Sequence, residues 1–155
     1  MLAVTLASGR VDAIWSSDLD RARATAEIVG SALGLPVRLD QRLREVDVGE
    51  WQGLTTSEIE VRYPEGLAKR RLGETGWVEG ESIAAMAERV VSCLLAIAVE
   101  HRGGRILVVT HGGAIGEACI AAGRARSEWT RVPNCSVHEI TLRPDGTLHQ
   151  VDPDL

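Results

Sequence analysis

Hydrophobic residues follow two kinds of pattern along this chain, one typical of helices and one typical of strands. Between Ile83 and Ala98 they recur every three or four residues, so a helix here would bury one apolar face. Shorter runs at residues 12–16, 37–39 and 105–110 have the length and the side-chain character of strands. The run at 105–110 contains four consecutive aliphatic residues, which is typical of a strand buried on both faces of a parallel sheet.

Local signals mark the ends of the predicted helices. A helix over residues 19–33 is closed by Gly34, because glycine readily adopts the left-handed conformation that ends many helices. Thr55 and Glu58 have the spacing of a capping box, which predicts that a helix begins there, and Pro64 stops that helix. The helix that begins at Ile83 is closed in the same way as the first, by two glycines before residue 105.

The remaining elements are predicted in the last third of the chain: a helix over residues 113–122 and strands over 136–142 and 147–151. Pro144-Asp145-Gly146 joins these two strands, either as a terminal hairpin or as consecutive strands. Alternation of strands with helices indicates an α/β fold, in which helices cover both faces of a mostly parallel sheet. No linker or repeat interrupts residues 1–155, so we expect a single domain.

Composition narrows the classes of function. The chain has 155 residues, 45% of them hydrophobic, and its net charge is −5. Its only basic run is Lys69-Arg70-Arg71, which we interpret as a solvated loop. Nucleic acid is therefore not an expected partner, because phosphate backbones are bound by clustered Lys and Arg. We also expect no membrane association, since neither a transmembrane stretch nor a signal peptide is evident.

Cysteines and histidines give no metal signature. Cys93, Cys119 and Cys135 are odd in number and lack CxxC spacing, so they indicate neither a disulfide framework nor a thiolate metal site. The four histidines have no metal-ligand spacing among themselves. We therefore expect no metal, no cofactor and a reduced, cytoplasmic setting.

His111 is the first candidate for a functional residue. It follows the apolar run at 105–110 and precedes Gly112 and Gly113, so it falls at the carboxyl edge of the predicted sheet. Ligands bind at this edge in open α/β sheets, where helix N-termini direct free amides and a positive dipole end toward anions. The alternative is a structural histidine, but such a residue is more usual within a helix or strand.

Arg21 has the same placement after the run at 12–16. An arginine in the first turn of a helix opposes the usual preference for acidic residues there, and a bound anion would explain it. Its planar guanidinium can hold two phosphate oxygens at once. A surface ion pair with Asp18 or Asp20 explains the residue equally well.

Residues 43–53, between these two junctions, contain candidates for a general acid, with solvated loop carboxylates as the alternative interpretation. Glu45, Asp47 and Glu50 follow no clean helical or strand period there. An acid that works near neutral pH needs burial or neighbouring negative charge to keep its proton, and a phosphoryl group would provide that charge. The residues themselves do not choose among the three carboxylates.

Four stretches together resemble the histidine phosphatase superfamily, also called the phosphoglycerate mutase-like family. They are SSDLDRARATAEIV, RLREVDVGEWQGLT, the Gly80-Glu81-Ser82 element and ILVVTHGG, and their order and separations also match. The resemblance covers the chain from about residue 12 to residue 142. It implies the phosphoglycerate mutase-like α/β fold.

The resemblance also implies roles for individual residues. Arg21, His111 and Gly112 are expected to bind the phosphoryl group, with His111 as the second active-site histidine. Glu45 is expected to give a proton to the leaving group. The implied activity is hydrolysis of small phosphate esters through a phosphohistidine, with mutase activity as a variant of the same chemistry.

One part of the family's site has no counterpart in this sequence. The family's nucleophilic histidine lies in an Arg-His-Gly motif that ends its first, central strand, whereas this chain has only His101-Arg102-Gly103, in another order. Residues 1–8 resemble the tail of the family's first helix. We therefore expect a domain that is incomplete at its N-terminus, with unpaired strand edges facing each other or an exposed apolar slot.

Three explanations of this difference are a misplaced start codon, a pseudoenzyme, and a second chain that completes the site, for example in a homo-oligomer. They lead to two hypotheses about function. Either the full-length protein is a phosphatase and residues 1–155 alone are inactive, or the chain is a catalytically dead phosphatase-like binding module. The basic run within residues 63–77, where the family reads its leaving group, favours an anionic substrate.

Overall fold

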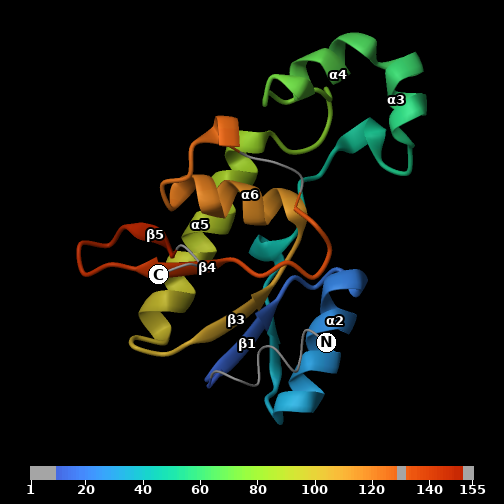
Figure 1. Ribbon diagram of the computed structural model, residues 1–155. Helices are drawn as coiled ribbons and strands as arrows, with labels where there is room; N and C mark the ends of the chain where they lie inside the picture. The colour runs from blue at the N-terminus through green and yellow to red at the C-terminus, as the bar shows by residue number, and fades with distance from the viewer. Residues whose placement is uncertain (1–9, 129–131, 152–155) are drawn as a thin grey trace.

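A computed structural model describes residues 10–128 and 132–151 (Figure 1). Residues 1–8, which resemble the tail of a helix, lie outside the described ranges. The helices and strands in chain order are β1 (Ala13–Ser16), α2 (Asp20–Leu33), β2 (Val37–Leu39), α3 (Thr56–Arg62), α4 (Pro64–Arg71), α5 (Ile83–Glu100), β3 (Ile106–Val109), α6 (Gly112–Ala121), β4 (Glu139–Leu142) and β5 (Leu148–Val151). Short 3₁₀ turns lie at Gln41–Leu43, Gly49–Trp51 and Arg126–Glu128.

The first three strands form a parallel sheet in the order β2-β1-β3 (Figure 1). Successive side chains of a strand point to opposite faces, so Ile14 and Trp15 of β1 enter two different cores. Ile14 packs with Ala26 and Val29 of α2, while Trp15 packs with Cys93 and Ile97 of α5. Helices thus cover both faces of a parallel sheet, as the sequence predicts.

Helix α5 also joins the sheet to the rest of the molecule. Met86 and Val90, in its first half, pack with Ala114 and Ala118 of α6. Trp51, which precedes α3, packs against the same cluster. Helices α3 and α4 project away from the sheet beyond this point (Figure 1). Within the described residues, no helix combines the length and the apolar character needed to cross a membrane.

The pattern at 105–110 predicts a strand buried on both faces, but the four residues of β3 are each only half-buried. The physical reason is its position, because β3 pairs with β1 alone among the described strands and forms the edge of the sheet. Strands β4 and β5 form a separate antiparallel hairpin. The ion pair between Arg105 and Glu139, at 3.6 Å, links the start of β3 to the start of β4.

Most predicted helix ends are confirmed. Gly34 closes α2 with a φ of 69°, and Thr55 and Glu58 form the capping box of α3. Pro64 does follow the end of α3, but it is also the first residue of α4, a helix that the sequence does not predict. Lys69-Arg70-Arg71 therefore lies in the last turn of α4 rather than in a loop. Positive charges in the last turn of a helix interact favourably with the helix dipole.

Burial of Ile14 of β1 against α2 should stabilise the folded protein. Ile14 is fully buried there, whereas Ile28 of α2 is 71% exposed. Truncation of a buried isoleucine removes apolar contacts and leaves a cavity, so Ile14→Ala should lower the free energy of unfolding by about 2 to 5 kcal/mol. Ile28→Ala is the matched control and should have little effect. Urea unfolding of both variants tests this, and equal losses would contradict it.

Candidate active site

His111 and Arg21 meet at the carboxyl edge of the parallel sheet. His111 follows β3 and is the N-cap residue of α6, while Arg21 lies in the first turn of α2, after β1. Because β1 and β3 are parallel neighbours with Ser16 opposite Val109, the segments that leave them emerge side by side. Arg21 Nε donates a hydrogen bond to His111 Nδ1 at 3.2 Å.

The partners of His111 define its protonation state. An arginine Nε always carries a hydrogen, so Nδ1 of His111 must be the acceptor and the ring must be neutral, with its hydrogen on Nε2. Nε2 then donates to Ser17 Oγ, 2.9 Å away. Burial of the ring, which is 7% exposed, and the charge of Arg21 hold the pKa of His111 below its ordinary value. The Glu45 carboxylate acts in the opposite direction.

The side chain of Glu45 lies at the N-terminus of α6, the helix that begins after His111. Its Oε2 accepts a hydrogen bond from the Gly113 amide at 2.9 Å, and its Oε1 accepts one from Val46 N at 3.0 Å. The contact requires glycine at position 113, because a Cβ there would overlap Oε1 of Glu45. The Glu45 carboxylate therefore lies next to His111 at the N-terminus of α6, where a negative charge interacts favourably with the helix dipole.

The two other candidate carboxylates are used within loops. Asp47 accepts hydrogen bonds from Gly49 N at 2.9 Å and Gln52 Nε2 at 2.6 Å. Glu50 accepts from the amides of Val78 and Glu79, and these bonds lower the pKa of Glu50. The structure therefore brings Glu45, of the three, beside His111.

The acidic neighbours of Arg21 in sequence pair with other arginines. Asp18 forms a two-pronged ion pair with Arg44, with N–O distances of 2.7 and 2.5 Å, and this pair lowers the pKa of Asp18. Asp20 pairs with Arg23 at 3.0 Å. The surface ion pair proposed as an alternative for Arg21 is thus not formed with either residue, and the guanidinium is directed to a neutral ring.

The sequence does not single out two further polar residues of this site. Ser17 is fully buried, and its Oγ also receives a hydrogen bond from Leu19 N at 3.3 Å. Thr110, directly before His111, donates from Oγ1 to the carbonyl of Leu43 at 2.6 Å. Serine and threonine are common after strands, so the sequence alone does not indicate these contacts. The contacts become evident from the pairing of β1 with β3.

His101-Arg102-Gly103 lies elsewhere. His101 follows α5 at the amino edge of the sheet, and its Nε2 is 3.2 Å from Trp15 Nε1, which donates to it. Gly112, by contrast, is the first residue of α6, directly after His111. Across residues 10–128 and 132–151, the His, Cys, Asp and Glu side chains do not gather in threes in a way that would hold a metal ion.

A histidine, an arginine and a carboxylate thus gather around one helix N-terminus at the carboxyl edge of a parallel sheet, where ligands bind in α/β proteins. A family model described as histidine phosphatase superfamily (branch 1) matches residues 1–151. The chain belongs to the histidine phosphatase superfamily. The resemblance of its four motifs is thereby confirmed.

Individual relatives agree with this assignment. Phosphoglycerate mutase-like protein 4 of Arabidopsis thaliana is 34% identical over 138 residues, which cover 86% of this chain and 60% of that protein. Glucosyl-3-phosphoglycerate phosphatase of Mycobacterium tuberculosis is 40% identical over 112 residues, or 66% of this chain and 50% of that protein. The chain thus matches about half to three fifths of the length of these curated relatives.

The fold agrees with solved structures. A mycobacterial glucosyl-3-phosphoglycerate phosphatase in complex with VO3 has a TM-score of 0.79 and 30% sequence identity to this chain. The match covers 97% of this chain and 78% of that one. The predicted phosphoglycerate mutase-like α/β fold is confirmed.

The charges around His111 predict opposite responses in two variants. Arg21→Gln should raise the pKa of His111, because a positive charge and a hydrogen bond to Nδ1 are lost. Glu45→Gln should lower it, because a negative charge is lost. Arg23→Gln, on the exposed side of α2, is the control and should leave the pKa unchanged. NMR titration of the His111 ring measures all three, and shifts of Arg21→Gln and Glu45→Gln in the same direction would exclude this electrostatic account.

Proposed function

We propose that the protein is a phosphomonoester hydrolase that acts on small phosphate esters through a phosphohistidine. The observation that carries the proposal is the convergence of Arg21, Glu45 and His111 at the N-terminus of α6. Membership of the histidine phosphatase superfamily and the phosphatase names of its relatives support it.

Arg21 and His111 would bind the phosphoryl group. Among the described contacts, Arg21 uses only Nε, on His111, so its two terminal nitrogens could bind phosphoryl oxygens. His111 Nε2–H, now directed to Ser17, would donate to a phosphoryl oxygen in place of the serine. Together with the amide of Gly112 at the start of α6, these donors would stabilise the charge of the phosphoryl group during transfer.

Glu45 would serve as the proton donor. A bound phosphoryl group is negatively charged and favours the protonated carboxyl. When the bond from phosphorus to the leaving oxygen breaks and a bond to the nucleophilic histidine forms, the proton of Glu45 passes to the leaving oxygen. In the second step Glu45 takes a proton from the water that attacks phosphorus, and phosphate and the free histidine result.

The nucleophilic histidine would come from a segment outside the 155 residues of this sequence. One edge of β3 pairs with none of the described strands, and this supports that part of the proposal. A strand added parallel to β3 at that edge would end beside His111, because the carboxyl ends of parallel strands lie at the same edge of a sheet. A nucleophilic histidine at the end of such a strand would lie near Arg21 and Glu45.

We propose further that the ester carries a second negative group. Lys69, Arg70 and Arg71 lie exposed at the end of α4, in the projecting segment. Positive charge at this place would favour an anionic leaving group. A mutase that transfers the phosphoryl group to a second substrate is the alternative activity, and the name of the Arabidopsis relative favours it.

The proposal predicts different activities for two forms of the protein. Residues 1–155 alone should release no phosphate from p-nitrophenyl phosphate, because this chain lacks the nucleophile. The product of the same gene extended upstream to include an Arg-His-Gly segment should release phosphate and form an acid-labile phosphohistidine. His111→Gln in the extended form should reduce turnover on the order of 10²-fold or more, because a donor to the developing charge is lost.

Two results would contradict this proposal. An extended form that binds phosphate without turnover would indicate a phosphatase-like binding module. Turnover by residues 1–155 alone, abolished by His111→Gln, would show that the nucleophile lies within this chain. Arg23→Gln, on the exposed side of α2, where Arg23 pairs with Asp20, serves as the control for general effects of substitution.

A further inference from the structure

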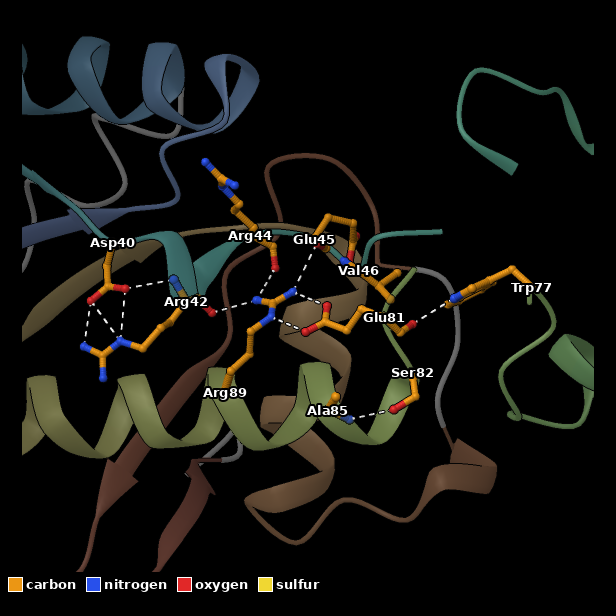
Figure 2. A network of polar contacts seen from close by, with 10 residues as sticks. All are labelled: Asp40, Arg42, Arg44, Glu45, Val46, Trp77, Glu81, Ser82, Ala85 and Arg89. Atoms are coloured by element: carbon orange, nitrogen blue, oxygen red, sulfur yellow. Dashed lines mark hydrogen bonds and ion pairs between the residues drawn. The ribbon is translucent and has the colours of Figure 1, made fainter. Parts of the chain in front are cut away.

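Arg89, in the middle of α5, directs its side chain to the segment that carries Glu45 (Figure 2). Nε and Nη2 donate to the two carboxylate oxygens of Glu81, each at 2.6 Å. Nη1 donates to the carbonyls of Arg42 and Arg44, both at 2.8 Å, and Nη2 donates to the carbonyl of Glu45 at 3.1 Å. A guanidinium has five N–H groups, and these five contacts use all of them.

Residues 42–45 are therefore held through their main chain. Arg89 binds three of the four carbonyls, and Thr110 Oγ1 binds the fourth, that of Leu43. Each carbonyl of the segment thus accepts a hydrogen bond from a side chain of α5 or from the end of β3. Since Thr110 precedes His111, this network fixes the backbone of Glu45 relative to the histidine.

Glu81 is itself placed firmly. Its amide donates to the carbonyl of Asp47 at 2.8 Å, and its carbonyl accepts from Trp77 Nε1 at 2.8 Å. Gly80 makes this approach possible, because its φ is 102° and a Cβ there would lie 2.5 Å from the Asp47 carbonyl oxygen. The Glu81 carboxylate can therefore orient the guanidinium of Arg89, and the pair is 19 to 23% exposed.

We infer that Arg89, oriented by Glu81, is a positioning residue that holds Glu45 in place for proton transfer. The inference rests on the proposed role of Glu45 as proton donor. Because every N–H of Arg89 is used within the protein, Arg89 has no donor left for a phosphoryl group and acts on the reaction through Glu45. Lysine cannot replace it, since an ammonium has three donors and no planar fork.

Esters with different leaving groups test the inference in the extended form that the proposed function expects to be active. Phenolate leaves poorly without a proton, whereas p-nitrophenolate leaves readily. Arg89→Lys should lower kcat for phenyl phosphate on the order of 10²-fold, as expected for a misplaced catalytic group, with a much smaller loss for p-nitrophenyl phosphate and little change in KM. Glu45→Gln should show the same selectivity, and Glu45→Gln combined with Arg89→Lys should lose no more than Glu45→Gln alone.

Two further variants separate positioning from folding. Arg126 forms a similar two-pronged pair with Glu117, at 2.9 and 2.7 Å, so Arg126→Lys disturbs an equivalent pair away from residues 42–45. It should affect both esters equally. Glu81→Gln retains the size of the side chain and should reproduce the selectivity of Arg89→Lys in weaker form, even where Arg89→Lys folds poorly. Equal losses for the two esters, or additive losses in the double variant, would overturn the inference.

A measurement without turnover separates this inference from the proposed function. The Gly113 amide donates to Glu45, so its ¹⁵N–¹H resonance reports where the carboxylate lies. In the 155-residue chain itself, Arg89→Lys should shift this resonance toward its position in Glu45→Ala, and Arg126→Lys should not. An unshifted Gly113 resonance would overturn the positioning role. Absence of hydrolysis of both esters by the unsubstituted extended form would instead refute the proposed function.

Discussion

Parallel pairing of β1 with β3 is the constraint on which the site depends. The pairing continues past the strand ends, since Ser17 N donates to the Val109 carbonyl at 3.0 Å. The segments that follow β1 and β3 therefore leave the sheet side by side and in the same direction. Ser17 and His111 can meet only because of this register, and α2 and α6 then begin beside each other. An antiparallel pairing would have placed these residues at opposite edges.

Electrostatics then assign different tasks to the arginines around the site. Arg44 is neutralised by Asp18, and Arg89 by Glu81, so both serve to hold loops. Arg21 instead donates to an uncharged ring, and its positive charge has no carboxylate directly bonded to it among the described contacts. The charge of Arg21 and the positive end of the α6 dipole are opposed by the Glu45 carboxylate, which lies at the same N-terminus. Desolvation and the charge of Arg21 together lower the pKa of the buried His111.

The sequence predicts the layers of the fold because each layer has its own periodicity. The apolar face of α5, the glycine after α2 and the capping box of α3 are local signals, and the structure confirms them. Helix α4 is missed because a proline that ends one helix is also a favoured first residue of the next. Half-burial of β3 is missed because a run of aliphatic residues does not reveal whether a strand has one neighbour or two.

Part of the site can likewise be predicted from the sequence, and part of it cannot. His111 and Arg21 follow predicted strands, so their convergence can be predicted from the rule for parallel sheets. The choice of Glu45 over Asp47 and Glu50 needs the family resemblance or the contact with Gly113, because all three are carboxylates in one loop. Arg89 has no sequence signal, since three of its five partners are main-chain carbonyls and any residue provides a carbonyl.

The same geometry relates the edge position of β3 among the described strands to the proposed chemistry. Arg21, Glu45 and His111 are each held by contacts within residues 17–113. These contacts do not involve the free edge of β3, so this part of the site can form without a further strand. A nucleophile that arrived on that edge would find the other groups already oriented, and little ordering would remain for its own placement. Binding of the anion and transfer of the phosphoryl group would then depend on different parts of the protein.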